Sequence, residues 1–184
     1  LQKLHDNLCL GLARGSPTAD LILSVTQFNI IRAVISNIAT MGMSTEEMGN
    51  DDTLSPWNMK NPWKLDLATL PPTLRPTELQ KLIPHHPWID PLPLPSVRDA
   101  LLRRMDDYDD TELCNDMMGE CGPSSGRPGL IIWCDPWDSY GFEITESFAQ
   151  KWIWMFKDCT DLLMSTNHWR RLRGEHPLFA IHSE

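Results

Sequence analysis

The chain has 184 residues, of which 41% are hydrophobic and 22% charged, a composition typical of a globular protein with a sizeable core. Its 16 basic and 25 acidic residues give a net charge of −9. Binding to phosphate backbones needs clustered Lys and Arg, so we expect no direct nucleic acid contact from this chain.

The cysteine pattern and the hydropathy of the chain bear on its compartment. Five cysteines without a CxxC pair, and no signal-peptide pattern, favour a reducing, intracellular environment. The apolar stretch 21–41 is long enough to cross a bilayer. We nevertheless predict no membrane span, because it contains Ser24, Gln27, Asn29, Arg32, Ser36 and Asn37.

Residues 1–42 are predicted to form the N-terminal helices. A short helix is expected over 2–13, and a long one over 18–42, between the Ser16-Pro17 start signal and Gly42. One half of the long helix is apolar. The opposite stripe carries a single charge, so we expect it to be covered as well; it consists of Thr26, Asn29, Arg32, Ser36, Asn37 and Thr40.

Residues 43–95 are predicted to be a long connection that ends in a proline-rich strap. Ten of the fifteen prolines fall between 56 and 95, which rules out a continuous helix or a central strand there. A short helix fits at 76–83. Prolines at 91, 93 and 95 favour a stiff polyproline II strap, whose apolar side chains pack on the core: Trp88, Ile89, Leu92 and Leu94.

Residues 96–184 are predicted to contain helices and one short strand. Ser96 with Asp99 indicates a helix start running to about residue 107, and Asp110 a second helix to residue 118. The strand 129–134 could pair with 141–145, and helices follow from Thr145 and near 160–173. We expect the eight tryptophans to form the centre of the core. The fold class is therefore mainly α: one compact helical domain over 1–184 with a Pro/Trp-rich strap and at most a small two-stranded β element.

Few residues suggest catalysis or metal binding. The adjacent His85 and His86 point in different directions in an extended chain, so we predict no metal site, and no cofactor motif is present. Asp135 and Asp138 follow the strand, where catalytic acids often lie, but an Asp-Pro-x-Asp turn explains them equally well. We predict a non-enzyme; the enzyme alternative would use Asp135, Asp138 or His86.

Charge gathers in two places along the chain. Residues 106–120 hold seven carboxylates and no Lys or Arg. They are either a solvated helix face or an acidic interaction surface, for which the candidates are Asp106, Asp107, Asp109 and Asp110. The basic stretch HWRRLR at 168–173 is expected to pair with local carboxylates.

Four stretches together resemble a fungal family defined as a domain of unknown function and found C-terminal to a basic-leucine-zipper (bZIP) region in transcription factors. The resemblance implies a nuclear, transcription-associated protein but supplies no mechanism, and these residues contain no basic region or zipper. The stretches are FNIIRAVISNIATMGM (28–43), LPPTLRPTELQKLIPHHPWIDPLPLPSVRDALL (70–102), GLIIWCDPWDSYGFEITESFAQKWIWMF (129–156) and TNHWRRLRGE (166–175).

The leading hypothesis is a non-catalytic regulatory domain of a fungal bZIP-type transcription factor, with protein partners or self-association and with its DNA-binding region outside this chain. The alternative is a small-molecule-sensing domain with a pocket between the 18–42 helix and the Trp-rich strand, where Arg32 would meet an anionic group. The ligand-binding or structural-anchor candidates are Arg32, His86, Trp88, Asp90, Trp133, Asp135 and Trp137.

Overall fold

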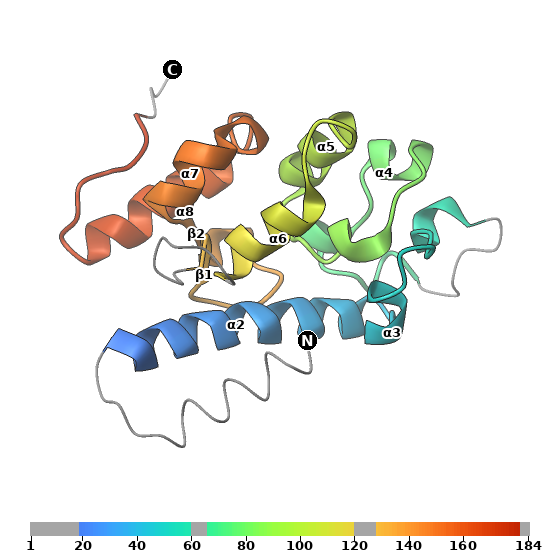
Figure 1. Cartoon of the computed structure of the whole chain (residues 1–184), viewed down its shortest axis with the longest axis horizontal. Helices are drawn as coiled ribbons and strands as arrows, with labels where there is room; N and C mark the ends of the chain where they lie inside the picture. Colours follow the sequence, from blue (N-terminus) through green and yellow to red (C-terminus); the bar gives the residue numbers. More distant parts are fainter. Residues whose placement is uncertain (1–18, 60–65, 120–127, 181–184) are drawn as a thin grey trace.

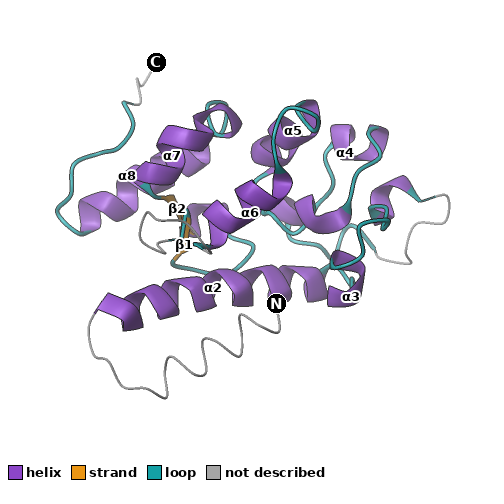
Figure 2. Cartoon of the chain, viewed as in Figure 1, coloured by secondary structure: helices purple, strands orange, loops and turns teal. Residues whose placement is uncertain are grey.

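The computed structural model describes residues 19–59, 66–119 and 128–180 (Figure 1). The helix expected at 2–13 lies outside the described residues. Helices dominate the chain, and a two-stranded antiparallel sheet is the β element, as predicted (Figure 2). Within the described ranges, no helix combines the length and the hydropathy that crossing a bilayer requires.

The long N-terminal helix is α2, Ala19–Thr40, and it runs along one side of the molecule (Figure 1). It ends as predicted at Gly42, whose φ of 69° is a left-handed conformation that glycine adopts without steric cost. The expected cover over its polar stripe is confirmed for Asn37, which is buried, and is wrong for Arg32, which is exposed. Asn37 Nδ2 donates to Pro91 O at 2.9 Å and to Pro136 O at 2.8 Å. It therefore fastens two turns from distant parts of the chain to α2.

The connection 43–95 contains short helical turns. They are α3 (Thr45–Met48), three 3₁₀ turns at Pro56–Asn58, Pro72–Leu74 and Pro87–Ile89, and α4 (Glu78–Leu82), which confirms the helix expected at 76–83. A capping box between Thr77 and Gln80 begins α4. The strap packs inward as predicted, since Ile89, Leu92 and Leu94 are buried.

Two predicted helix caps are wrong, Ser96 by two residues and Asp110 by one. Helix α5 is Pro95–Arg103, with Pro95 in its first turn and no side-chain cap, so Ser96 is not the cap and the helix ends before residue 107. Asp99 instead accepts a hydrogen bond from Thr77 Oγ1 at 2.6 Å, because α4 packs against α5. Helix α6 is Asp110–Met118, and its cap is Asp109, which accepts from the Glu112 backbone N–H.

The C-terminal part carries the small sheet and two helices. Strand β1 (Leu130–Ile132) pairs with β2 (Phe142–Ile144) in the register Ile131 opposite Glu143. Helices α7 (Glu146–Trp152) and α8 (Thr160–Leu172) follow, and α8 packs on β2 while α2 packs on β1. The sheet therefore lies between the N-terminal and C-terminal helices.

The core consists of aliphatic residues and phenylalanine rather than tryptophan. Among the described tryptophans only Trp152 is fully buried, so the expectation of a tryptophan-centred core is wrong. The indole N–H needs a partner, which favours half-buried positions where the ring packs and the nitrogen reaches a polar group. Trp133 and Trp169 show this, since their Nε1 atoms donate to Glu143 and to Tyr140 O. The buried Trp152 also has a partner, because its Nε1 donates to Asp116.

Candidate functional site

A fully buried carboxylate, Asp90, holds the proline-rich segment together. It follows the 3₁₀ turn Pro87–Ile89 and accepts from Ser55 Oγ at 2.7 Å and from Gln80 Nε2 at 2.6 Å. His85 Nε2 lies 2.9 Å from its Oδ1 atom. Burying a carboxylate is costly unless it is well hydrogen-bonded, and here three side chains from different segments supply those bonds. Asp90 is therefore a structural hub.

The hydrogen bonds of His85 show that this hub shares a proton. His85 Nδ1 lies 2.7 Å from Ile83 O, which can only accept, so Nδ1 donates. Its Nε2 faces the Asp90 carboxylate, so one proton must lie between these two groups as well. The Ser55–Asp90–His85 order also differs from a nucleophilic triad, because the serine donates to the aspartate and none of the three is accessible to a substrate.

A buried arginine, Arg98 on α5, binds the backbone of the strap through its guanidinium group. Its guanidinium donates to Leu92 O at 3.1 Å, Asp90 O at 3.3 Å and Arg75 O at 2.7 Å. Burial lowers the pKa of Arg98 to about 10, against the opposing effect of the Asp90 and Asp99 carboxylates. Arg98, and not the exposed Arg32, is therefore the arginine that anchors the strap to the core.

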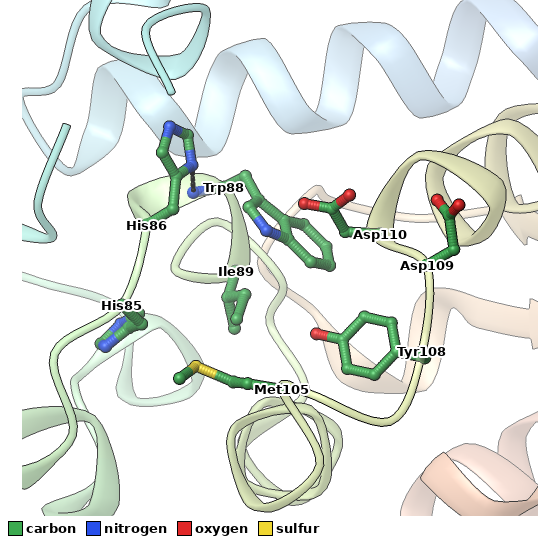
Figure 3. Close-up of a pocket in the computed structure, with 8 residues that line it drawn as sticks. All are labelled: His85, His86, Trp88, Ile89, Met105, Tyr108, Asp109 and Asp110. Atoms are coloured by element: carbon green, nitrogen blue, oxygen red, sulfur yellow. Dashed lines mark hydrogen bonds between the residues drawn. The ribbon is translucent and has the colours of Figure 1, made fainter. Parts of the chain in front are cut away.

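A cleft of about 330 Å³ lies beside this segment, between the Pro87–Ile89 turn and the connection from α5 to α6 (Figure 3). The rings of Trp88 and Tyr108 line it, and Asp109 and Asp110 stand on the side where α6 begins. The remaining lining residues are His85, His86, Ile89 and Met105. The structure thus places the HHPW motif next to the acidic stretch, which the sequence had given as separate features.

The cleft combines an aromatic surface with negative charge. Asp106 and Asp107 stand between the lining residues Met105 and Tyr108 and are exposed; Asp107 lies 4.0 Å from Arg104. Both ring nitrogens of His86 are used in hydrogen bonds within the chain: Nδ1 accepts from Trp88 N, and Nε2 lies 3.0 Å from Asn50 O. Such a cleft favours a cationic or hydrogen-bond-donating group next to an apolar one.

Tyr108 reports the electrostatics of the cleft. Burial raises its pKa to about 12, with the negative charge of Asp110 adding to the effect. Because the folded state holds the phenol proton more tightly than the unfolded state, the protonated Tyr108 contributes to the stability of the fold. This contribution is fully present below about pH 10 and is lost as the pH rises towards 12. The neighbouring thiol of Cys114 behaves likewise, because burial and Asp110 raise its pKa to about 11.

We expect the phenol of Tyr108 to titrate about two pH units above an ordinary tyrosine. The chain has two tyrosines, so a Tyr140→Phe variant isolates Tyr108 for an ultraviolet titration of phenolate absorbance. Tyr108→Phe, which retains the exposed Tyr140, supplies the reference curve. Coincident midpoints in the two variants would contradict the buried, acidic environment of Tyr108.

Most other candidate residues lie elsewhere. Asp138 Oδ1 accepts from Tyr140 N at 2.9 Å, so it forms a turn, and Asp135 is exposed. Trp133 and Trp137 are 43% and 37% exposed and do not line the cleft, nor does Arg32. The structure therefore brings together His86, Trp88, Asp109 and Asp110, with Asp106 and Asp107 at the border of the cleft. Asp90 belongs to the buried hub, and the other candidates lie elsewhere.

Two of the three arginines of 168–173, Arg170 and Arg173, pair with carboxylates as predicted. Arg173 binds Glu143 through two hydrogen bonds of 2.8 and 2.6 Å and also contacts Glu175. Arg170 lies 3.4 Å from Glu175. Among residues 19–59, 66–119 and 128–180 there is no group of three or more His, Cys, Asp or Glu side chains arranged to hold a metal ion.

The sequence contained two patterns that could have revealed the buried network. Thr77 and Gln80 have capping-box spacing, which places Gln80 at a helix start. Leu94, Val97, Arg98 and Leu101 follow the i, i+3, i+4, i+7 spacing of a buried helix face, so Arg98 stands at a core position. Tyr108 had no such pattern, because its surroundings come from segments distant in sequence.

Comparison with known proteins gives one match. No curated protein and no solved structure matches this chain significantly. The profile of one family, described as Domain of unknown function (DUF3425), matches residues 52–163, which is more than half of the chain and includes the whole cleft and the Asp90 hub. This chain therefore belongs to the DUF3425 family.

Proposed function

We propose that this chain is a non-catalytic protein-interaction domain that regulates a fungal bZIP-type transcription factor in the nucleus. The DNA-reading region would lie outside these residues. The sequence stretches that resemble such factors support the biological setting, and the cleft between the Pro87–Ile89 turn and α6 supports the interaction role.

The observation that carries the proposal is the pairing of an aromatic cleft with an acidic border. Tryptophan and tyrosine are enriched among the residues that dominate binding energy at protein interfaces, particularly where they line pockets. Trp88 and Tyr108 are such residues here, and each is only partly buried. Exposed carboxylates around them would attract and orient a partner of opposite charge.

This chemistry fits one kind of partner segment. An apolar side chain would enter between Trp88 and Tyr108, and flanking Lys or Arg residues would face the aspartates. Rigid support favours binding, because less conformational freedom is lost. The cleft has that support, since the turn that carries Trp88 is fixed by the Asp90 hub and by the bond between His86 and Asn50.

Replacing the four border aspartates by serine is expected to reduce recovery of protein partners about tenfold or more. The measurement is quantitative mass spectrometry of proteins that co-purify with the tagged chain from nuclei of its own host. Folding should be unaffected, because these positions are exposed and serine at position 109 can still cap α6. The substitutions are Asp106→Ser, Asp107→Ser, Asp109→Ser and Asp110→Ser.

A control variant changes the same number of charges at exposed acidic positions outside the cleft: Asp66→Ser, Glu146→Ser, Asp158→Ser and Asp161→Ser. It should retain its partners. Equal recovery from the wild type and the border variant would exclude the acidic border as the contact surface. Equal losses in both variants would show that only net charge matters.

A further inference from the structure

Helix α2 presents an exposed stripe with regular spacing. In the part of the helix where side-chain burial is described, the exposed positions are 25, 28, 32, 35 and 39, separated by three and four residues in alternation. We call this stripe the outer seam of α2; it consists of Val25, Phe28, Arg32, Ile35 and Ala39. Val25, Phe28 and Ile35 are 49%, 48% and 41% exposed.

The composition of the outer seam is unlike that of a solvated helix face, which normally carries several Lys and Glu residues. Its single charge is Arg32, which makes no ion pair with any residue that the structure describes. The opposite side of α2 already packs on β1 and the strap, through residues such as Ile30 and Ala33. A helix that is apolar on both sides is typical of one that is covered on both sides.

The alternation of three and four residues is the spacing by which one helix packs along another. In an antiparallel pair of identical helices, residue pairs whose numbers have a constant sum face each other. If the two-fold axis crosses α2 at the height of residue 30, the paired numbers sum to 60. Val25 then faces the partner subunit's Ile35, and Phe28 faces the partner subunit's Arg32. The outer seam is therefore complementary to itself, as a two-fold interface requires.

The pairing of Phe28 with arginine determines the orientation. A guanidinium over an aromatic face is attracted by the ring, and the attraction increases as water is removed. A parallel pair would instead place Arg32 directly against the partner subunit's Arg32, and two like charges would repel each other. Residues that flank the seam, such as Asn29 and Ser36, are uncharged, so they add no repulsion between two copies.

We propose that the outer seam of α2 is the interface of an antiparallel homodimer of this chain. This surface is separate from the acidic cleft, because none of its residues lines the cleft. Figure 1 shows α4 to α8 and the sheet on one side of α2. We infer that the occupant is a second copy of the chain, because an antiparallel copy offers an apolar partner to Val25 and a guanidinium to Phe28.

The test is sedimentation velocity of the full chain over a range of concentrations. The wild type should dimerise, and Phe28→Arg should raise the dissociation constant at least tenfold, because it sets two arginines against each other. The exchanged variant Phe28→Arg with Arg32→Phe restores one ring opposite one guanidinium and should bring the constant back near the wild-type value. Both positions are exposed, so the fold of the single chain should be retained and the far-ultraviolet circular dichroism spectrum should not change.

Disulfide trapping determines the orientation. In a background with Cys9→Ser, Cys121→Ser and Cys134→Ser, the double variant Val25→Cys with Ile35→Cys should form a covalent dimer. Val25→Cys alone should not, since the two copies of position 25 would be about 15 Å apart along an antiparallel pair.

Three results would overturn the dimer proposal. A chain that stays monomeric at every concentration would show that the outer seam is solvated or that something other than a second copy covers it. A dimer that tolerates Phe28→Arg would place the interface elsewhere. Crosslinking of the Val25→Cys variant by itself would show a parallel pair. The border-aspartate variant should dimerise like the wild type. The dimer proposal can therefore hold even if the co-purification experiment fails, and the two proposals are tested independently.

Discussion

Replacing Arg98 with alanine is expected to lower the free energy of unfolding by about 3–5 kcal/mol. Arg98 is fully buried, and its guanidinium is the donor for the carbonyls of Asp90, Leu92 and Arg75. Alanine would leave these carbonyls without that donor, at a cost of about 1–3 kcal/mol for each buried group that finds no replacement, and would open a cavity. Chemical denaturation measured by tryptophan fluorescence reports the change.

Two further substitutions separate the causes. Arg98→Met fills much of the volume but donates no hydrogen bond, so it should recover only the cavity component. Arg103→Ala, five residues later on the same helix, removes a 61% exposed side chain that contacts Asp99 at 3.5 Å. It should cost less than about 1 kcal/mol. Equal effects of Arg98→Ala and Arg103→Ala would show that the buried guanidinium does not hold the strap.

Replacing Asp90 with alanine should have a similar effect, a loss of about 3–5 kcal/mol. The carboxylate binds Ser55, Gln80 and His85, so its removal leaves three buried polar groups without their partner. His85 is the most affected, because its ring is buried and the proton it shares with Asp90 loses its acceptor. The same denaturation measurement applies, with Asp135→Ala, an exposed aspartate, expected within about 0.5 kcal/mol of the wild type.

A double-mutant cycle tests whether His85 and Asp90 act as a unit. If they do, His85→Ala together with Asp90→Ala should cost clearly less than the sum of the two single changes, since the second substitution removes a group that has already lost its partner. Additive effects would mean that the two residues stabilise the fold independently. Loss of the hub should also weaken partner binding at the cleft, because Trp88 lies on the turn that Asp90 fixes.

Local sequence rules were sufficient for most elements of secondary structure. Helix α2 could be predicted from its apolar composition and its Gly42 end, because each acts through neighbouring residues. The strand at 130–132 was recognisable from β-branched residues between a glycine and an Asp-Pro turn. The cap of α5 was predicted two residues too late at Ser96, and that of α6 one residue too late at Asp110. Pro95 and Asp109 are equally good start signals, and only packing selects between the neighbouring candidates.

The sequence by itself determined the helical character, the small sheet, the inward-facing strap and the acidic stretch of this chain, because periodicity, caps and prolines act over a few residues. The tertiary structure alone decided which charges are buried. Arg98 donates to a carbonyl 23 residues away in the sequence, and Asn37 on α2 donates to one 99 residues away. Arg32, on the same helix as Asn37, is exposed to solvent. The cleft was decided in the same way, since Trp88 and Tyr108 meet only after the strap and α5 have packed. Burying a charge depends on partners that folding brings from distant segments, and spacing along the chain carries no information about them.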